Sequence, residues 1–258
     1  MLKKIRRLID SFKWVNWRVK NAANMRRIIK GLTNLENDPE RFFPLYNLEI
    51  AALLFNMGET FDFASIFHSS SALALGLIIK LNAKLSDREK EELHRLTFKR
   101  LIKESKAKGL LDEKHYELAD DIRHIRNCYV HFENLMAYIK RTYEYYQDRK
   151  GILSKYETEE ERRIAEIILN SQQVAPFPVQ DITWCASMRT VKFLEKRHAT
   201  FGRELVKTLA ASYGDNIEEK KVKREYERLE GLGVSTADAS YCLNNTARIL
   251  TYIGILPK

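Results

Sequence analysis

The amino-acid sequence predicts an all-α fold, and three observations carry that prediction. Apolar residues recur at intervals of three and four positions rather than two, as amphipathic helices require. Helix start and stop signals punctuate these periodic stretches. No convincing series of strands can be traced anywhere along the chain. We therefore expect a helical bundle followed by a smaller helical unit at the C-terminus.

Composition limits the classes of function. The chain has 258 residues, of which 31% are charged and 45% hydrophobic, which is typical of a soluble globular protein with one or two domains. Its three cysteines, Cys128, Cys185 and Cys242, match no metal-ligand spacing and no disulfide framework, so we expect a reducing cytoplasm. Nucleotide-binding glycine loops and the zinc-binding His-Glu-x-x-His pattern are absent, so we expect neither a cofactor nor a metal.

Basic charge is concentrated at the N-terminus. Residues 1–30 contain ten basic groups and one acid, and this difference of 10 − 1 = +9 equals the net charge of the whole chain. Apolar residues, including Trp14 and Trp17, interleave with these charges. The segment 1–36 is expected to be helical, with its residues 1–30 either packed on the body, bound to nucleic acid or lying on a membrane surface. If it binds RNA, the expected contacts are Lys3, Lys4, Arg6 and Arg7.

The body of the protein is predicted to span 37–171. Pro39 marks the first helix start, and Pro44 is expected to reset the chain. A later helix begins at Ser86 or Asp87, with Glu89 completing its N-terminal signal, and ends at Gly109. The uncharged run 63–79 is too short and too polar to span a membrane, so we expect it to be a buried core helix. The expected helices cover 48–57, 63–85, 86–109, 112 to about 149, and 151–171.

A proline-containing stretch, 172–180, is expected to act as a linker or as a crossing within one helical domain. The C-terminal domain 181–258 is then predicted to hold helices over 183–210, 218–230 and 236–253. The last of these resembles the second half of a winged-helix or helix-turn-helix unit, although Arg248 is its one basic residue. The stretch 236–253 therefore either binds DNA or serves as a packing or oligomerisation helix.

The most informative six residues are Arg126-Asn127-Cys128-Tyr129-Val130-His131. Histidine exchanges protons near neutral pH, because its unperturbed pKa is about 6.5. Arginine carries a permanent planar cation that suits phosphate oxygens. Together these two side chains suit phosphodiester cleavage.

This pattern resembles the R-x4-H motif of HEPN domains, small helical domains found in many metal-independent ribonucleases. The resemblance covers roughly 42–149 and implies a homodimer in which motif residues of two protomers converge on one cleft. It implies an endoribonuclease of stress response or defence, with His131 as general base, Arg126 stabilising the phosphorane and Asn127 orienting the phosphate or the histidine. The residues expected to contact RNA beside them are Arg123, His124 and Tyr129.

Two other interpretations remain open. In the first, Arg126 pairs with an acid such as Asp121 or Glu133, His131 is partly buried, and the domain is a scaffold that binds RNA or a protein without catalysis. In the second, the protein is a DNA-binding regulator that uses 236–253. An active motif requires accessible side chains, whereas DNA binding requires an exposed basic face on that last helix. Elsewhere, His198 lies among Lys196, Arg197 and Arg203, which we interpret as a solvated basic face.

Overall fold

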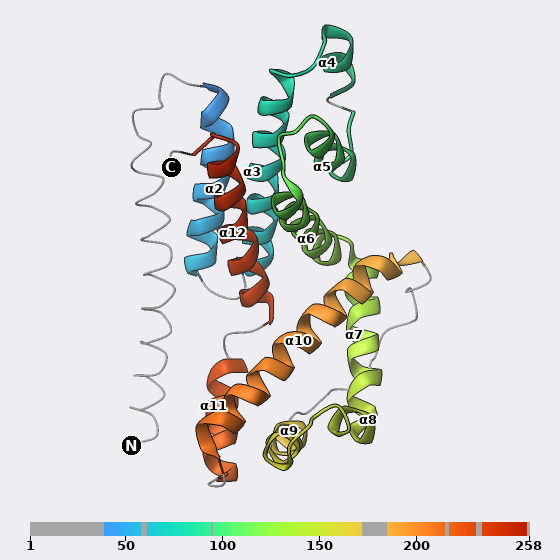
Figure 1. The fold of residues 1–258 in the computed structure, drawn as a ribbon, viewed down its shortest axis with the longest axis vertical. Coiled ribbons are helices and arrows are strands. Elements are labelled where there is room, and N and C mark those ends of the chain that lie inside the picture. Colours follow the sequence, from blue (N-terminus) through green and yellow to red (C-terminus); the bar gives the residue numbers. More distant parts are fainter. Residues whose placement is uncertain are drawn as a thin grey trace. The chain divides into compact units, whose positions relative to one another are not determined.

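The structure is a computed structural model that describes residues 39–57, 61–93, 95–171, 185–214, 217–230 and 234–256. These residues form helices and no strands, which confirms the all-α prediction (Figure 1). The predicted basic segment 1–36, including Lys3, Lys4, Arg6 and Arg7, lies outside the described residues, as does the predicted linker 172–180.

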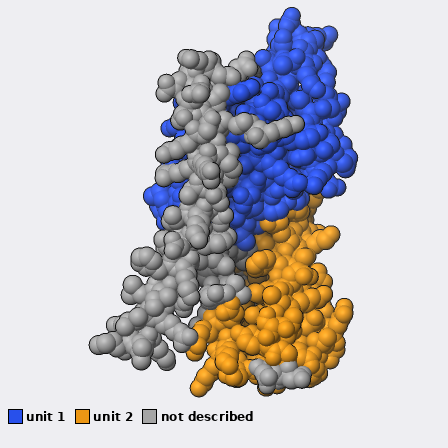
Figure 2. All heavy atoms as spheres, turned by 60° about the vertical axis from the view of Figure 1, so that its left-hand side comes forward, with its two compact units in different colours: residues 1–126, 235–258 blue, residues 127–234 orange. Residues whose placement is uncertain are grey.

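The described residues fall into two compact units (Figure 2). Unit 1 contains the residues up to Arg126 together with those from Ser235 onward, and unit 2 contains 127–234. The sequence predicted a different division, with a body over 37–171 and a C-terminal domain over 181–258. The difference has two causes: the last helix belongs to unit 1, and the predicted body is divided after Arg126, so that 127–171 belongs to unit 2.

Unit 1 is built around a helical hairpin. The Ser65 hydroxyl donates a hydrogen bond of 2.8 Å to the Ala51 carbonyl and ties the two helices of the hairpin together. Fully buried side chains such as Leu48, Phe55 and Leu73 fill the core between its helices. The helices of unit 1 are α2 (Pro39–Met57), α3 (Asp62–Asn82), α4 (Asp87–Leu93), α5 (Phe98–Ala107), α6 (Glu113–Val130, shared with unit 2 beyond Arg126) and α12 (Val234–Tyr252).

Helix α12 runs parallel to α3 and packs closely on it (Figure 1). At one end the Thr236 hydroxyl donates a 2.5 Å hydrogen bond to the buried Asp62 carboxylate. Towards the other end Gly76 lies so close to Leu250 that a Cβ at this position would fall 2.4 Å from the leucine Cδ2. A larger residue here would force the Leu250 side chain to shift, so glycine permits this close approach of the helices.

Several helix boundaries are set by a capping residue or a glycine close to the helix end. Gly109 has φ 67° and ends α5, as the sequence predicted. Asp112 accepts a 2.8 Å hydrogen bond from the His115 N–H and so caps the start of α6. Three expectations are wrong here. Pro44 lies inside α2 without ending it, and the helix predicted over 86–109 is divided at Thr97, which caps α5. The helix predicted over 151–171 is interrupted between Leu153 and Glu159.

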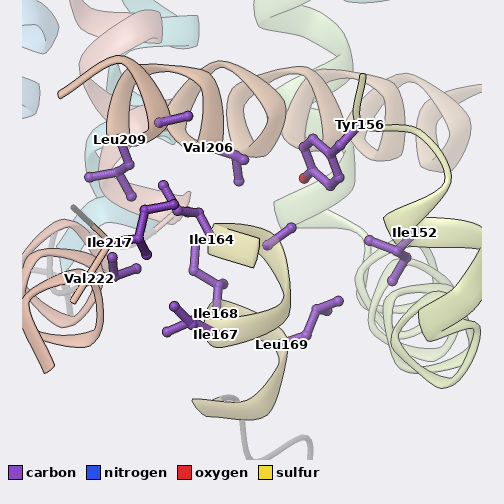
Figure 3. Close-up of a cluster of buried hydrophobic side chains, with 12 residues drawn as sticks. Ile152, Tyr156, Ile164, Ile167, Ile168, Leu169, Val206, Leu209, Ile217 and Val222 are labelled. Carbon is purple, nitrogen blue, oxygen red and sulfur yellow. The ribbon is translucent and has the colours of Figure 1, made fainter. Parts of the chain in front are cut away.

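Unit 2 packs a second set of helices around a separate apolar core. Helix α10 contacts α7 and α9, and α9 also contacts α8 and α11. Figure 3 shows this core, in which Ile164 and Ile168 meet Val206, Leu209 and Val222. The helices are α7 (Phe132–Gln147), α8 (Arg149–Leu153), α9 (Glu159–Ser171), α10 (Met188–Tyr213) and α11 (Glu219–Glu230).

Tyr156 lies at one side of this core (Figure 3). Burial raises the pKa of its phenol to about 12, because a phenolate would lose solvation there. The neighbouring tyrosines 145 and 146 act in the same direction. Tyr156 therefore contributes to packing as a neutral side chain.

Among the described residues, α3 is the one helix long and apolar enough to cross a membrane by length and composition alone. Half of its apolar window is buried inside the structure. Its small side chains Ser65, Ser69 and Ala72 lie on the buried face, while Phe63 and Phe67 are exposed. The burial agrees with the core helix predicted over 63–79.

Candidate functional site

The predicted motif lies where one helix ends and the next begins. Helix α6 ends at Val130, because His131 adopts an extended backbone with φ −98° and ψ 106°, and α7 begins at Phe132. The prediction of one continuous helix to about residue 149 is therefore wrong. The angular spacing expected for a straight helix does not apply to His131. Arg126 belongs to unit 1, and Asn127 to His131 belong to unit 2.

Backbone hydrogen bonds hold His131 on both sides of this break. Its N–H donates to the Asn127 carbonyl at 3.3 Å, as it would in a continuing helix. Its own carbonyl accepts from the N–H groups of Asn134 and Leu135 at 2.9 and 3.2 Å. The histidine backbone is thus fixed although its conformation is not helical.

The His131 side chain is accessible. Its side chain is 48% exposed and makes no capping hydrogen bond to α7. Its Nδ1 lies 3.8 Å from Glu133 Oε1, which is within ion-pair distance but too long for a hydrogen bond. The imidazole therefore has access to a ligand from solvent, with one carboxylate nearby.

Asn134 is a site residue that the sequence reasoning did not single out. Its side chain is buried, and its Nδ2 donates to the Asn127 carbonyl at 3.0 Å. Its Oδ1 accepts a 2.6 Å hydrogen bond from the backbone N–H of Ser187, the residue that precedes α10. One amide therefore joins the end of α6, the start of α7 and the start of α10. The sequence signal that could have identified Asn134 is its position as a polar residue directly before the apolar run Leu135-Met136-Ala137.

Two further contacts hold α10 along α7 within unit 2. The Tyr138 hydroxyl and His198 Nδ1 are 2.5 Å apart. Arg141 pairs with Glu195. Figure 1 shows α10 beginning beside the start of α7, as the Asn134 contact requires. The position of α10 relative to the His131 backbone is thus set by several contacts.

Arg126 is only partly exposed in unit 1. Burial lowers the pKa of its guanidinium, since the cation loses solvation, but an arginine remains charged at neutral pH. Asp121, one acid proposed as its structural partner, accepts a 2.8 Å hydrogen bond from the Tyr241 hydroxyl. Glu133, the other, lies near His131.

Arg123 and His124 are both buried, unlike residues that contact RNA directly. Arg123 Nε donates to Asp120 Oδ1 at 2.6 Å, and its Nη2 lies 2.6 Å from His124 Nε2. A guanidinium can only donate, so this histidine nitrogen must act as the acceptor. The two residues form an internal polar cluster. Their burial does not agree with the prediction that they contact RNA directly. Tyr129 is half-buried.

Helix α12 does not offer the face that DNA recognition requires. Its buried residues include Thr236, Asp238, Cys242 and Leu250. Arg248 is exposed and is its one basic residue. Helix α12 is therefore a core helix of unit 1, and it lacks the exposed basic face that a DNA-reading helix over 236–253 requires.

In the ranges that the structure describes, no group of three or more His, Cys, Asp or Glu side chains could hold a metal ion. Comparison of the chain with models of protein families, with curated proteins and with solved structures finds no match.

Proposed function

We propose that this protein is a metal-independent endoribonuclease of the HEPN type, which acts as a homodimer on RNA in the cytoplasm, in stress response or defence. The observation that carries the proposal is the accessible imidazole of His131, held at a helix break by its own backbone. The R-x4-H pattern supplies Arg126 and Asn127 beside it in the sequence. An exposed histidine with a fixed backbone suits proton transfer, because a general base must first lie within hydrogen-bond reach of the proton that it removes.

The proposed reaction needs only these side chains. His131 removes the proton from a ribose 2′-hydroxyl, the 2′-oxygen attacks the adjacent phosphorus, and the bond to the 5′-oxygen breaks. The leaving 5′-oxygen takes a proton from water, and the protonated imidazole returns its proton to solvent. Arg126 stabilises the negative charge of the phosphorane. The products are a 2′,3′-cyclic phosphate and a free 5′-hydroxyl, and DNA is not a substrate because it lacks the attacking oxygen.

The test is cleavage of a labelled RNA pool with EDTA present. His131→Ala and Arg126→Ala should each reduce cutting by about 10² to 10⁴, the usual contribution of a positioned proton-transfer or charge-stabilising group. His68→Ala is the matched control, since this histidine bonds Asn47 in unit 1 and has no proposed role. Circular dichroism checks that all variants are folded.

The chemical ends of the products separate this mechanism from a contaminating nuclease. Cyclic-phosphate ends from the wild type, lost in both motif variants and kept in His68→Ala, would support the proposal. Equal activity in all four proteins would refute it. If the wild type bound RNA but left every RNA intact, the non-catalytic scaffold would replace the nuclease.

A further inference from the structure

Helix α10 carries a stripe of basic side chains on its solvent face. At about 100° per residue, five of its basic residues fall within an arc of roughly 60°. All five are exposed, and from first to last they extend about 27 Å along the helix axis at 1.5 Å per residue. We call them the α10 stripe: Arg189, Lys192, Lys196, Arg203 and Lys207.

The opposite side of α10 explains why the stripe faces solvent. Val191, Leu194, Val206 and Leu209 are buried on that side. The contacts of α10 with α7 and α9 use this buried side. The stripe is therefore fixed in direction by the core of unit 2.

The three lysines of the stripe are not neutralised by neighbouring acids. Helix α10 has six basic and two acidic residues, a difference of 6 − 2 = +4. One of the acids, Glu195, pairs with Arg141 of α7, and the other, Glu204, lies about 60° or more from the stripe by helix geometry. Within the described residues, Lys192, Lys196 and Lys207 form no ion pair.

Two lysines of the neighbouring helix α11 behave differently. On α11, Lys221 and Lys223 pair with Glu218 and Glu219 at 2.6 and 2.5 Å. The three lysines of the stripe therefore present charge along about four turns of α10 without an ion pair to any described acid. Such a row is suited to binding a polyanion whose charges are regularly spaced.

The stripe begins at the candidate site. The Asn134 amide holds the residue before α10 at 2.6 Å and the Asn127 carbonyl at 3.0 Å, so Arg189 and Lys192 lie in the turns of α10 nearest the His131 backbone. The N-terminus of a 26-residue helix adds partial positive charge at the same end. A strand bound along the stripe would thus run towards the histidine.

We infer that the α10 stripe binds the phosphate backbone of single-stranded RNA and leads the strand to His131. This inference rests on the proposed function for the direction of the strand, but not for the binding itself. Lysine and arginine contacts to phosphates release counterions, so binding should not depend on base sequence and should weaken with salt.

The test is fluorescence anisotropy with a 2′-O-methyl RNA, which binds as RNA does but cannot be cut by 2′-hydroxyl attack. The stripe variant is Lys192→Gln, Lys196→Gln and Lys207→Gln, which keeps long side chains and removes three charges. Its matched control is Lys220→Gln, Lys221→Gln and Lys223→Gln on α11, which removes the same net charge from the same unit. Both are compared with the wild type from 50 to 300 mM salt.

The stripe variant should bind at least about ten-fold more weakly at 100 mM salt, and its log–log salt slope should fall by about 2, or three contacts at 0.7 each. The control should stay within about two-fold of the wild type. Equal weakening in both variants, or none in the stripe variant, would overturn the inference. The inference would also be overturned if the stripe variant lost binding to anionic vesicles but kept its RNA binding, because the stripe would then bind a membrane surface instead.

The outcomes also separate this inference from the nuclease proposal. His131→Ala should retain full RNA affinity, because it removes no cation of the stripe. If the wild type binds through the stripe but never cuts, the stripe stands and the nuclease falls. If the stripe variant cuts RNA with an unchanged KM, the nuclease stands and the stripe falls.

Discussion

Asn134→Leu offers a direct measure of how the candidate site is held together. The change keeps the side-chain volume and removes both hydrogen bonds, to the Asn127 carbonyl at 3.0 Å and from the Ser187 N–H at 2.6 Å. The Asn127 carbonyl keeps its 3.3 Å bond from the His131 N–H, but the bond that joins α10 to the break is lost.

The expected cost follows from these contacts. A typical hydrogen bond contributes about 0.5–1.5 kcal/mol, and a buried group left unsatisfied costs about 1–3 kcal/mol. The loss of two bonds, one leaving a partner unsatisfied, should lower the free energy of unfolding by about 2–3 kcal/mol. For a chain of this size the thermal midpoint should fall by roughly 4–12 °C.

The assay is thermal and urea unfolding followed by far-UV circular dichroism. Asn170→Leu is the control, since Asn170 is exposed and accepts a 2.7 Å hydrogen bond from Arg149 on the surface. It should change stability by no more than about 0.5 kcal/mol. Asn134→Leu as stable as the wild type, or a control equally destabilised, would refute the reasoning.

Asn134→Asp adds a pH test of the same contact. The aspartate keeps an acceptor for the Ser187 N–H but places a carboxylate against the Asn127 carbonyl. Burial and this repulsion raise the pKa of the new carboxyl in the folded state, so the variant should be relatively more stable at low pH and lose that stability as pH rises. A variant whose stability relative to the wild type does not change with pH would contradict this placement.

Three further predictions concern packing, pH dependence and assembly. Gly76→Val should destabilise unit 1 by about 1–3 kcal/mol, because the valine side chain would collide with Leu250. Gly202→Ala on the open surface of α10 should instead stabilise the protein by up to about 1 kcal/mol. Urea unfolding measures both changes. Hydrogen bonds from Lys108 and from the Ser86 backbone and hydroxyl lower the pKa of Glu89 to about 2. The stability lost in Glu89→Gln should therefore be constant above about pH 5 and disappear as pH falls towards 2. A series of thermal melts at different pH values measures this loss. Light scattering on the purified protein should give about twice the 30.3 kDa mass of one chain, and a monomer at all concentrations would contradict the proposed homodimer.

Local signals in the sequence were sufficient for the fold class and for many helix ends. Periodic apolar residues indicated helices because a helix must bury one side. Gly109 and Asp112 marked their helix ends because a left-handed residue and an N-cap act within one turn. The R-x4-H pattern also located the exposed His131, although the break in the helix at that residue carried no glycine or proline to predict it.

The tertiary structure decided what contacts between distant residues determine. Thr236 and Asp62 are separated by 174 positions, and their hydrogen bond places the last helix in the core of unit 1 rather than in a C-terminal domain. Burial of Arg123 and His124, and the bridge from Asn134 to Ser187, depend in the same way on which helices meet.

The sequence by itself determined that this chain is helical and where many of its helices begin and end, since these follow from periodicity and capping. It also contains the six-residue R-x4-H pattern on which the proposed RNA cleavage depends. Only the tertiary structure decided which of those side chains reach solvent and which basic residues align into one stripe on α10. The physical reason is that exposure and alignment depend on the neighbours that a helix acquires in the fold, and local sequence does not encode those neighbours.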